Sequence, residues 1–222
     1  MDSPASRQYL RDLFSTLARG DVIITLNWDA AADRSLFEIN RWNPHDGYSF
    51  AKTLVPESPF ASPGLPEKLT IPSEIVLLKL HGSVGWRSPD DHHLIFGKYF
   101  LQQLLSKDVE TLLIDAEQKK YLYPLFQPLM AYPSYLKTVQ NKFLRKIWQQ
   151  ADVAIRLAGV VEIYGYSLPE SDVAMSLLLA PLRWRAAVNE VKVEVNDPNG
   201  EVLDRYRTFF DGKVTLCKRA LG

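Results

Sequence analysis

The stretch Val22-Ile23-Ile24-Thr25-Leu26-Asn27-Trp28-Asp29 decides the fold class. Its first five residues are apolar or β-branched and follow Gly20-Asp21, which predicts a short buried strand over 22–26. The residues before it repeat apolar side chains at helical spacing, at Leu10, Leu13, Phe14 and Leu17. That spacing predicts an amphipathic helix over 6–19, ended by Gly20.

Further strands recur along the chain. We predict a second buried strand at 75–80, a strand at 160–164, one at 191–195 in which Val191, Val193 and Val195 alternate with polar residues, and a short last strand at 213–217. A long helix is predicted over 136–154 and another over 167–187. Helices alternating with apolar strands are typical of an α/β fold, so we expect a Rossmann-like, mostly parallel sheet flanked by helices in a single domain over 1–222. Two segments fall outside the alternation, a Pro-, Gly- and Ser-rich long loop at 43–72 and an inserted loop or helical segment at 97–135.

Composition excludes several classes of protein. The 26 basic residues balance the 26 acidic ones, so nothing indicates nucleic-acid binding. Cys217 is the single cysteine, which rules out an internal disulfide and a thiolate zinc site. No apolar stretch is long enough for a membrane span, and the first residues lack the apolar core of a signal peptide. We therefore expect a cytoplasmic protein with no metal and no membrane partner.

Polar residues follow each predicted strand directly. The first strand is followed by Asn27 and Asp29, and the second runs into His81-Gly82-Ser83. The next two are followed by Gly165-Tyr166-Ser167 and Asn196-Asp197-Pro198. Ligands of open α/β sheets bind beyond the carboxyl ends of the strands, so these residues are the candidate site.

These segments carry a family resemblance. Thr25-Leu26-Asn27-Trp28-Asp29 resembles the T-x-N-x-D segment of sirtuins and of bacterial SIR2-like domains, and Lys79-Leu80-His81-Gly82-Ser83 resembles their strand ending in His-Gly-Ser. The stretch from Tyr164 to Asp172 is similar to the G-Y-S-L-P-x-x-D turn of the bacterial branch, and Val195-Asn196 to the late strand ending in Asn. The motifs occur in the family's order.

The resemblance implies NAD as substrate or ligand and cleavage of its nicotinamide–ribose bond, an activity that many bacterial relatives use in phage defence. By resemblance, His81 is the base and Asn27 positions the ribose or the attacking water. Thr25 and Asp29 belong to the cofactor site, Asp29 at the nicotinamide amide. The resemblance also places Gly165 and Ser167 at the phosphates or ribose of NAD, and Asn196 at its adenosine ribose. NAD or ADP-ribose is then the small-molecule partner, and a homo-oligomer or an effector-domain partner is compatible with this picture.

The chain departs from the family pattern in two places. It lacks the four cysteines of the zinc module, which argues against a classical deacetylase. It also lacks the Gly-Ala-Gly-x-Ser loop that holds the pyrophosphate in the family, so we expect either a fragment of a longer protein or a reduced copy with a rebuilt phosphate site. The alternative to a hydrolase is a catalytically silent module that binds NAD or ADP-ribose or another protein.

Purely structural interpretations stay open for the same residues. Asn27, Asp29 and Asn196 could form side-chain turns, and Ser167 with Glu170 fits a capping box at a helix start. Lys79 interrupts an apolar strand and is interpreted as snorkelling or paired. The tryptophans are interpreted as core or loop anchors; they are Trp28, Trp42, Trp86, Trp148 and Trp184.

Overall fold

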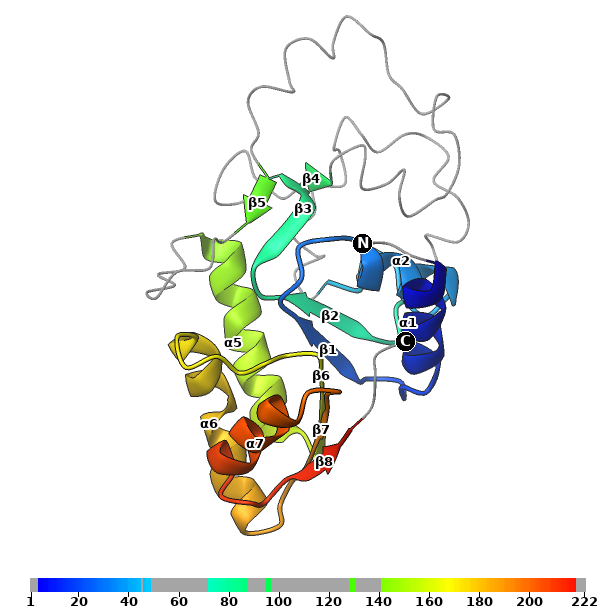
Figure 1. Ribbon diagram of the computed structural model, residues 1–222. Helices are drawn as coiled ribbons and strands as arrows, with labels where there is room; N and C mark the ends of the chain where they lie inside the picture. Colours follow the sequence, from blue (N-terminus) through cyan, green and yellow to red (C-terminus); the bar gives the residue numbers. More distant parts are fainter. Residues whose placement is uncertain are drawn as a thin grey trace, which may run out of the picture. The chain divides into compact units, whose positions relative to one another are not determined.

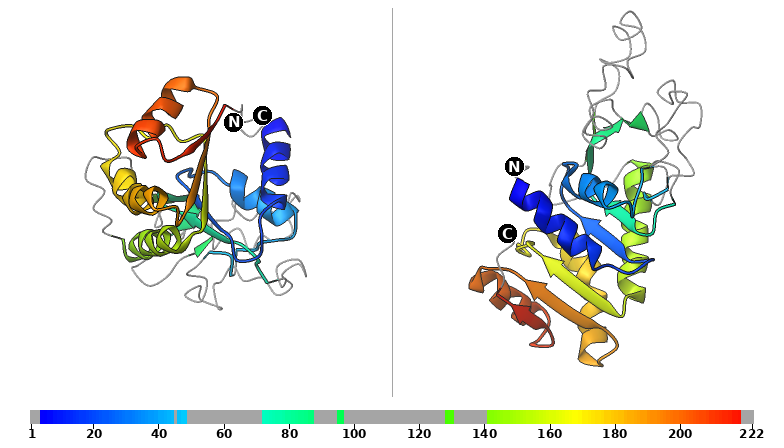
Figure 2. Two further views of the ribbon diagram at one scale, coloured as in Figure 1. Left: turned by 90° about the horizontal axis from the view of Figure 1, so that it is seen from below. Right: turned by 90° about the vertical axis from the view of Figure 1, so that its right-hand side faces the viewer.

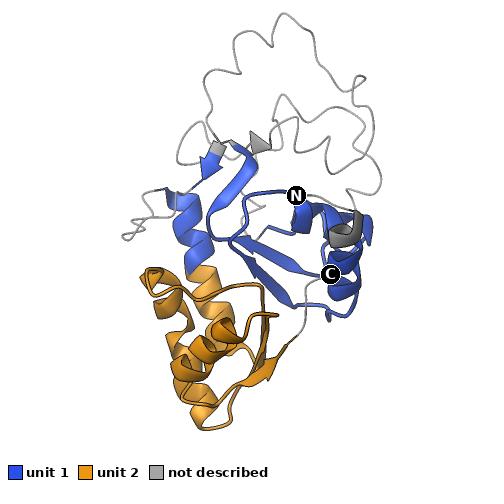
Figure 3. Cartoon of the chain, in the orientation of Figure 1, with its two compact units in different colours: residues 1–132, 139–148 blue, residues 133–138, 149–222 orange. Residues whose placement is uncertain are grey.

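The computed structural model describes residues 4–44, 46–48, 72–87, 95–96, 128–130 and 141–218 (Figure 1). The chain divides into two compact units (Figure 3). Unit 1 comprises residues 1–132 and 139–148, and unit 2 comprises residues 133–138 and 149–222. The predicted loop at 43–72 and the predicted insertion at 97–135 lie almost wholly outside the described residues.

Unit 1 begins with a helix, a strand, a second helix and a second strand. These are α1 (Pro4–Ser15), β1 (Val22–Thr25), α2 (Ala31–Glu38) and β2 (Val76–Lys79). β1 and β2 pair in parallel, from Val22 opposite Val76 to Thr25 opposite Lys79. The first predicted helix and the first two predicted strands are present, each shorter than predicted. β1 is only partly buried where a buried strand was predicted, and α1 ends at Ser15 and not at Gly20. α2 was not predicted, because its eight residues are too few to show a helical repeat.

A small antiparallel sheet follows β2 in unit 1. It contains β3 (Gly82–Arg87), β4 (Ile95–Phe96) and β5 (Pro128–Met130), in the order β4-β3-β5. The chain enters it at Gly82, whose φ is 80°. A Cβ at this position would lie 2.0 Å from the carbonyl oxygen of Leu129, so only glycine fits the passage from β2 to β3.

Unit 2 is built from two strand–helix–strand repeats that follow the end of α5 (Lys142–Leu157). In chain order its elements are β6 (Val160–Tyr164), α6 (Val173–Ala187), β7 (Lys192–Asn196), α7 (Gly200–Phe209) and β8 (Thr215–Cys217). The strands form a parallel sheet in the order β6-β7-β8. All three predicted strands of this region are confirmed. The protein is thus a mixed α/β protein with small parallel sheets; a complete Rossmann sheet remains a prediction.

The sheet of unit 2 has one apolar face and one polar face. Helices α6 and α7 lie on the same side of it (Figure 2), as two successive crossovers of one hand require. Val193 and Val195 of β7 are buried, while Glu162 and Thr215, which share the register of Glu194, are exposed. The alternation of valines with polar residues from which this strand was predicted is thus confirmed.

A buried ion pair lies in the interior of unit 1. Lys79 Nζ is 2.7 Å from Asp33 Oδ2, and both side chains are fully buried. Lys79 also donates to the backbone oxygen of Asp29, and the Tyr48 hydroxyl donates to Asp33 Oδ1. The interpretation of Lys79 as a paired residue is confirmed. Snorkelling is wrong, because the ammonium group is enclosed with its carboxylate partner.

Aromatic rings enclose this ion pair. Tyr48 lies edge-on to Trp42 and to Trp86, with ring centroids 4.8 and 4.9 Å away. Burial and the neighbouring Asp33 carboxylate raise the pKa of Tyr48 well above its ordinary value, so the phenol keeps its proton and donates it. The prediction of Trp42 and Trp86 as core anchors is confirmed, since both are buried.

Removing one partner of this pair should be strongly destabilising. Lys79→Met leaves the Asp33 carboxylate buried without its cation, which costs about 3–5 kcal/mol of unfolding free energy. The double variant Lys79→Met/Asp33→Leu should recover most of that loss, because no lone charge stays buried. Urea unfolding measures both. Arg207→Met is the control, because its ion pair with Asp204 is exposed at the surface; it should leave the midpoint unchanged. Equal effects of Lys79→Met and Arg207→Met would contradict the assignment.

Candidate functional site

The predicted site residues of unit 1 lie together at one edge of the parallel β1–β2 pair. The ladder ends with Thr25 opposite Lys79, and the Leu80 N–H donates to the Thr25 carbonyl at 3.0 Å. Asn27 and His81 follow at equal distances along their two strands. The register therefore brings the amide and the imidazole to the same strand ends.

Hydrogen bonds join the two loops that carry these residues. The Trp28 carbonyl accepts from the Val84 N–H at 3.0 Å and from Ser83 Oγ at 3.3 Å. Lys79 holds the Asp29 carbonyl from the interior. The loop 26–29 is thus fixed to the start of β3 and to the buried ion pair.

The side chains in this loop differ in how they are used. Asp29 Oδ1 accepts from the Ala31 N–H at 3.0 Å, so its carboxylate forms the side-chain turn that leads into α2. Thr25 Oγ1 accepts from the Asn27 N–H at 3.1 Å. Asn27 is exposed, and the turn at this residue is formed by its backbone N–H and the Thr25 hydroxyl. The turn interpretation therefore holds for the Asp29 side chain, and the Asn27 amide lies at the surface of the strand ends.

His81 is held in one tautomer by a backbone carbonyl. Its side chain is 7 % exposed, and Nδ1 lies 3.2 Å from the Leu26 carbonyl oxygen. A carbonyl can only accept, so Nδ1 carries a proton toward Leu26 and Nε2, which is buried, is the nitrogen left to accept one. This is the arrangement that orients an imidazole as a general base.

The predicted site residues of unit 2 lie at the carboxyl ends of β6 and β7. Tyr164 pairs with Asn196, and the Gly165 N–H donates to the Asn196 carbonyl at 3.4 Å. Gly165 has a φ of 60°, which turns the chain away from the strand. Ser167 is exposed just beyond this turn. The structure therefore brings Gly165, Ser167 and Asn196 together within this unit.

Asn196 carries a fully buried side-chain amide. The Cys217 thiol and, more weakly, the Asn196 amide lower the pKa of Glu194, so the amide interacts with this carboxylate, but among the described residues neither Oδ1 nor Nδ2 makes a hydrogen bond of ordinary geometry. The turn after β7 uses its neighbours instead, since Asp197 Oδ1 accepts from the Asn199 N–H at 2.8 Å and Asn199 caps α7. The alternative that Asn196 forms the turn is therefore wrong. A buried polar group without a partner is destabilising and calls for an explanation.

The predicted capping box at Ser167 is wrong, because α6 begins later. Its N-cap is Asp172, whose Oδ1 accepts from the Met175 N–H at 3.2 Å. Leu168 has a φ of 46°, a left-handed conformation that no helix can contain, and Pro169 follows it. The segment from 165 to 171 is thus a loop that lies before the helix.

Two tyrosines hold this loop in place. The Tyr166 hydroxyl donates to Asp172 Oδ2 at 3.0 Å, and the buried Tyr206 donates to the Tyr166 carbonyl at 2.9 Å. Burial, and next the Asp172 carboxylate, raise the pKa of Tyr166, so it remains a donor. Sequence reasoning missed Asp172 as a cap and both tyrosines. Asp172 could have been found, since a carboxylate directly precedes the apolar helix.

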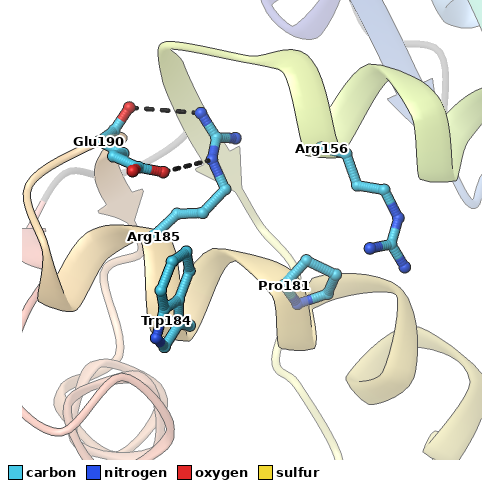
Figure 4. A pocket seen from close by; sticks show the side chains of 5 residues that line it. All are labelled: Arg156, Pro181, Trp184, Arg185 and Glu190. Atoms are coloured by element: carbon cyan, nitrogen blue, oxygen red, sulfur yellow. Dashed lines mark hydrogen bonds and ion pairs between the residues drawn. The ribbon is translucent and has the colours of Figure 1, made fainter.

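A shallow hollow also occurs in unit 2, apart from the predicted site residues (Figure 4). It has a volume of about 340 Å³ and is lined by Arg156, Pro181, Trp184, Arg185 and Glu190. Arg185 Nε lies 3.8 Å from Glu190 Oε2 at its rim. Trp184 is 67 % exposed, so its interpretation as an anchor in the core is wrong.

Comparisons of the chain with protein-family models, curated proteins and solved structures found no match. The resemblance to SIR2-like domains therefore depends on the quoted motifs and stays a prediction. Within residues 4–44, 46–48, 72–87, 95–96, 128–130 and 141–218, three or more His, Cys, Asp or Glu side chains are nowhere grouped so as to hold a metal ion. Helices in those ranges are also too short or too polar to cross a bilayer.

Replacing the buried amide should stabilise the unliganded protein. Asn196→Leu keeps the size of the side chain and removes two buried polar atoms that lack a hydrogen bond of ordinary geometry, so the free energy of unfolding should rise by about 1 kcal/mol. The matched control is Asn199→Leu, which removes the cap of α7 and should lower stability by about 1 kcal/mol. Thermal or urea unfolding gives both values. Destabilisation by Asn196→Leu equal to that of the control would show that the amide is paired in solution.

Proposed function

We propose that this protein is an NAD-consuming hydrolase that cleaves the bond between nicotinamide and ribose. The observation that carries the proposal is the pairing of Asn27 and His81 at adjacent strand ends, with the His81 tautomer set by the Leu26 carbonyl. A neutral imidazole with a basic Nε2 is suited to accept a proton near neutral pH. The resemblance of the surrounding motifs to SIR2-like domains supplies NAD as the substrate.

The reaction needs little acid catalysis, because nicotinamide leaves as a neutral molecule. The bond from C1′ of the ribose to the pyridinium nitrogen breaks, and its electron pair goes to that nitrogen. The ribose develops oxocarbenium character, as in other glycosidic cleavages. Water then attacks C1′ and loses its proton to His81 Nε2, which yields ADP-ribose. Asn27 positions the water or the ribose hydroxyl through its exposed amide.

The residues of unit 2 support nucleotide binding. An amide offers both a donor and an acceptor, which matches the hydroxyls of a ribose. Binding would give the buried Asn196 amide the partners that it lacks among the described residues. Gly165 and Ser167 form an exposed turn beside it, where backbone and hydroxyl groups are available to phosphate or ribose oxygens.

The alternative is a catalytically silent module that binds NAD or ADP-ribose. The feature that favours it is the absence from the sequence of the Gly-Ala-Gly-x-Ser loop. Such a module would bind its ligand through Asn196, Gly165 and Ser167 and would not depend on His81 for binding. Turnover distinguishes the two functions.

The hydrolase is tested by nicotinamide release from NAD, followed by chromatography. Asn27→Ala and His81→Ala should each lower kcat about 100-fold or more, the range of general-base and positioning groups. Asn40→Gly is the control, because Asn40 is exposed with a φ of 58° that glycine also adopts; it should keep full activity.

Calorimetry with ADP-ribose accompanies the activity assay. If both active-site variants still bind ADP-ribose but no longer release nicotinamide from NAD, the hydrolase is supported. Binding without turnover by the unaltered chain would establish the silent module, and neither binding nor turnover would contradict both proposals.

A further inference from the structure

Helix α6 presents a row of large apolar side chains to the solvent. Val173 is 50 % exposed, Leu177 68 %, Trp184 67 % and Val188, at the helix C-cap, 47 %. Between and beside them on this face lie Ala180, Pro181 and Ala187, and the exposed Arg183 and partly exposed Ser176 flank one edge. We call the seven apolar residues the α6 stripe.

The opposite face of α6 packs into the core of unit 2. Its buried residues are Met175, Leu178, Leu179, Leu182 and Ala186. A helix that covers a sheet normally carries polar side chains on its outer face. An exposed contiguous apolar surface of this kind is typical of a protein–protein interface.

The spacing of the α6 stripe is symmetric about its centre. The large residues are separated by four, seven and four positions, and Ala180 and Pro181 occupy the midpoint. A second α6 packed antiparallel would place Val173 opposite Val188 and Leu177 opposite Trp184. The alternation of three- and four-residue steps is also the pattern that lets two helices interdigitate. An interface of twofold symmetry requires such self-complementarity.

We propose that the α6 stripe is the interface of a homodimer, in which two copies of α6 pack antiparallel about a twofold axis between Ala180 and Pro181. The proposal is independent of the assignment of NAD as substrate. Its occupant is a second copy of this chain, because the symmetric spacing fits the stripe to itself.

The antiparallel arrangement also opposes the two helix dipoles, which places the positive end of one helix beside the negative end of its neighbour.

The hollow in Figure 4 and the end of α5 extend the surface. Trp184 and Pro181 line the hollow together with Arg156 of α5, so it lies beside the position that Leu177 of the second copy would occupy. On α5, Val153 is 54 % and Leu157 78 % exposed. Stable interfaces bury about 800 Å² per partner, and the side chains of both helices contribute to that area.

The test is the mass of the full chain by sedimentation velocity over a range of concentrations. We expect a dimer that Leu177→Lys and Trp184→Lys each weaken at least 30-fold in dissociation constant, as central interface residues do. Lysine is a good helix former, so both variants should keep their helical circular dichroism. The matched control is Thr215→Lys, on the exposed polar face of the sheet, which should leave the dimer intact.

Cross-linking tests the geometry. Ala180→Cys in a Cys217→Ser background should give a covalent dimer with a short bis-maleimide, whereas Thr215→Cys in the same background should not. A monomer at all concentrations, or a dimer that both lysine variants leave unchanged, would overturn the proposal. Equal cross-linking at positions 180 and 215 would overturn the antiparallel arrangement.

Discussion

The ion pair between Lys79 and Asp33 is the constraint on which the organisation of unit 1 depends. Two opposite charges without exposure to water are tolerated only when each is fully hydrogen-bonded, and here Tyr48 and the Asp29 carbonyl complete the set. The pair joins the end of β2 to α2 and to the loop after β1. These are the segments that carry Asn27 and His81.

In unit 2, a second set of polar contacts fixes the loop that carries predicted site residues. Asp172 starts α6 and receives the Tyr166 hydroxyl, and Tyr206 fixes the Tyr166 carbonyl. The loop that contains Gly165 and Ser167 is therefore held at the ends of β6 and β7. Beside this satisfied network, Asn196 stands out because its amide is buried without a hydrogen bond of ordinary geometry to the described part of the chain. Stability alone would favour an apolar residue there, so the amide is consistent with a ligand-binding role.

Much of the fold was predictable because parallel strands have a simple signature. The strands that contain Val22, Val76, Val160 and Val193 are short runs rich in β-branched residues and bounded by polar or turn residues, and each is present in the structure, although Val22 and Val160 are exposed. Short elements such as α2 escaped prediction, since eight residues give too little periodicity. The start of α6 was placed wrongly because the Ser167–Glu170 spacing imitates a cap. The left-handed Leu168 that prevents it depends on backbone geometry, which spacing does not show.

The candidate site was predictable as a set of strand ends but not as a set of contacts. Position along the chain indicated Asn27 and His81, and the register of β1 with β2 places them at the same edge. Sequence could not tell that Asp29 forms the turn into α2 while Asn196 forms none, because both residue types favour turns. The exposed face of α6 was also hidden, since an apolar helix without a polar side looks like a core helix in sequence.

The proposed binding of NAD is tested most directly by amide hydrogen exchange with and without the dinucleotide, read by mass spectrometry. Bound NAD should slow exchange in the peptides that contain residues 26–29 and 80–84 of unit 1 and residues 164–168 and 195–198 of unit 2, and should leave the outer face of α6 unchanged. Protection at none of these strand ends under saturating NAD would contradict it.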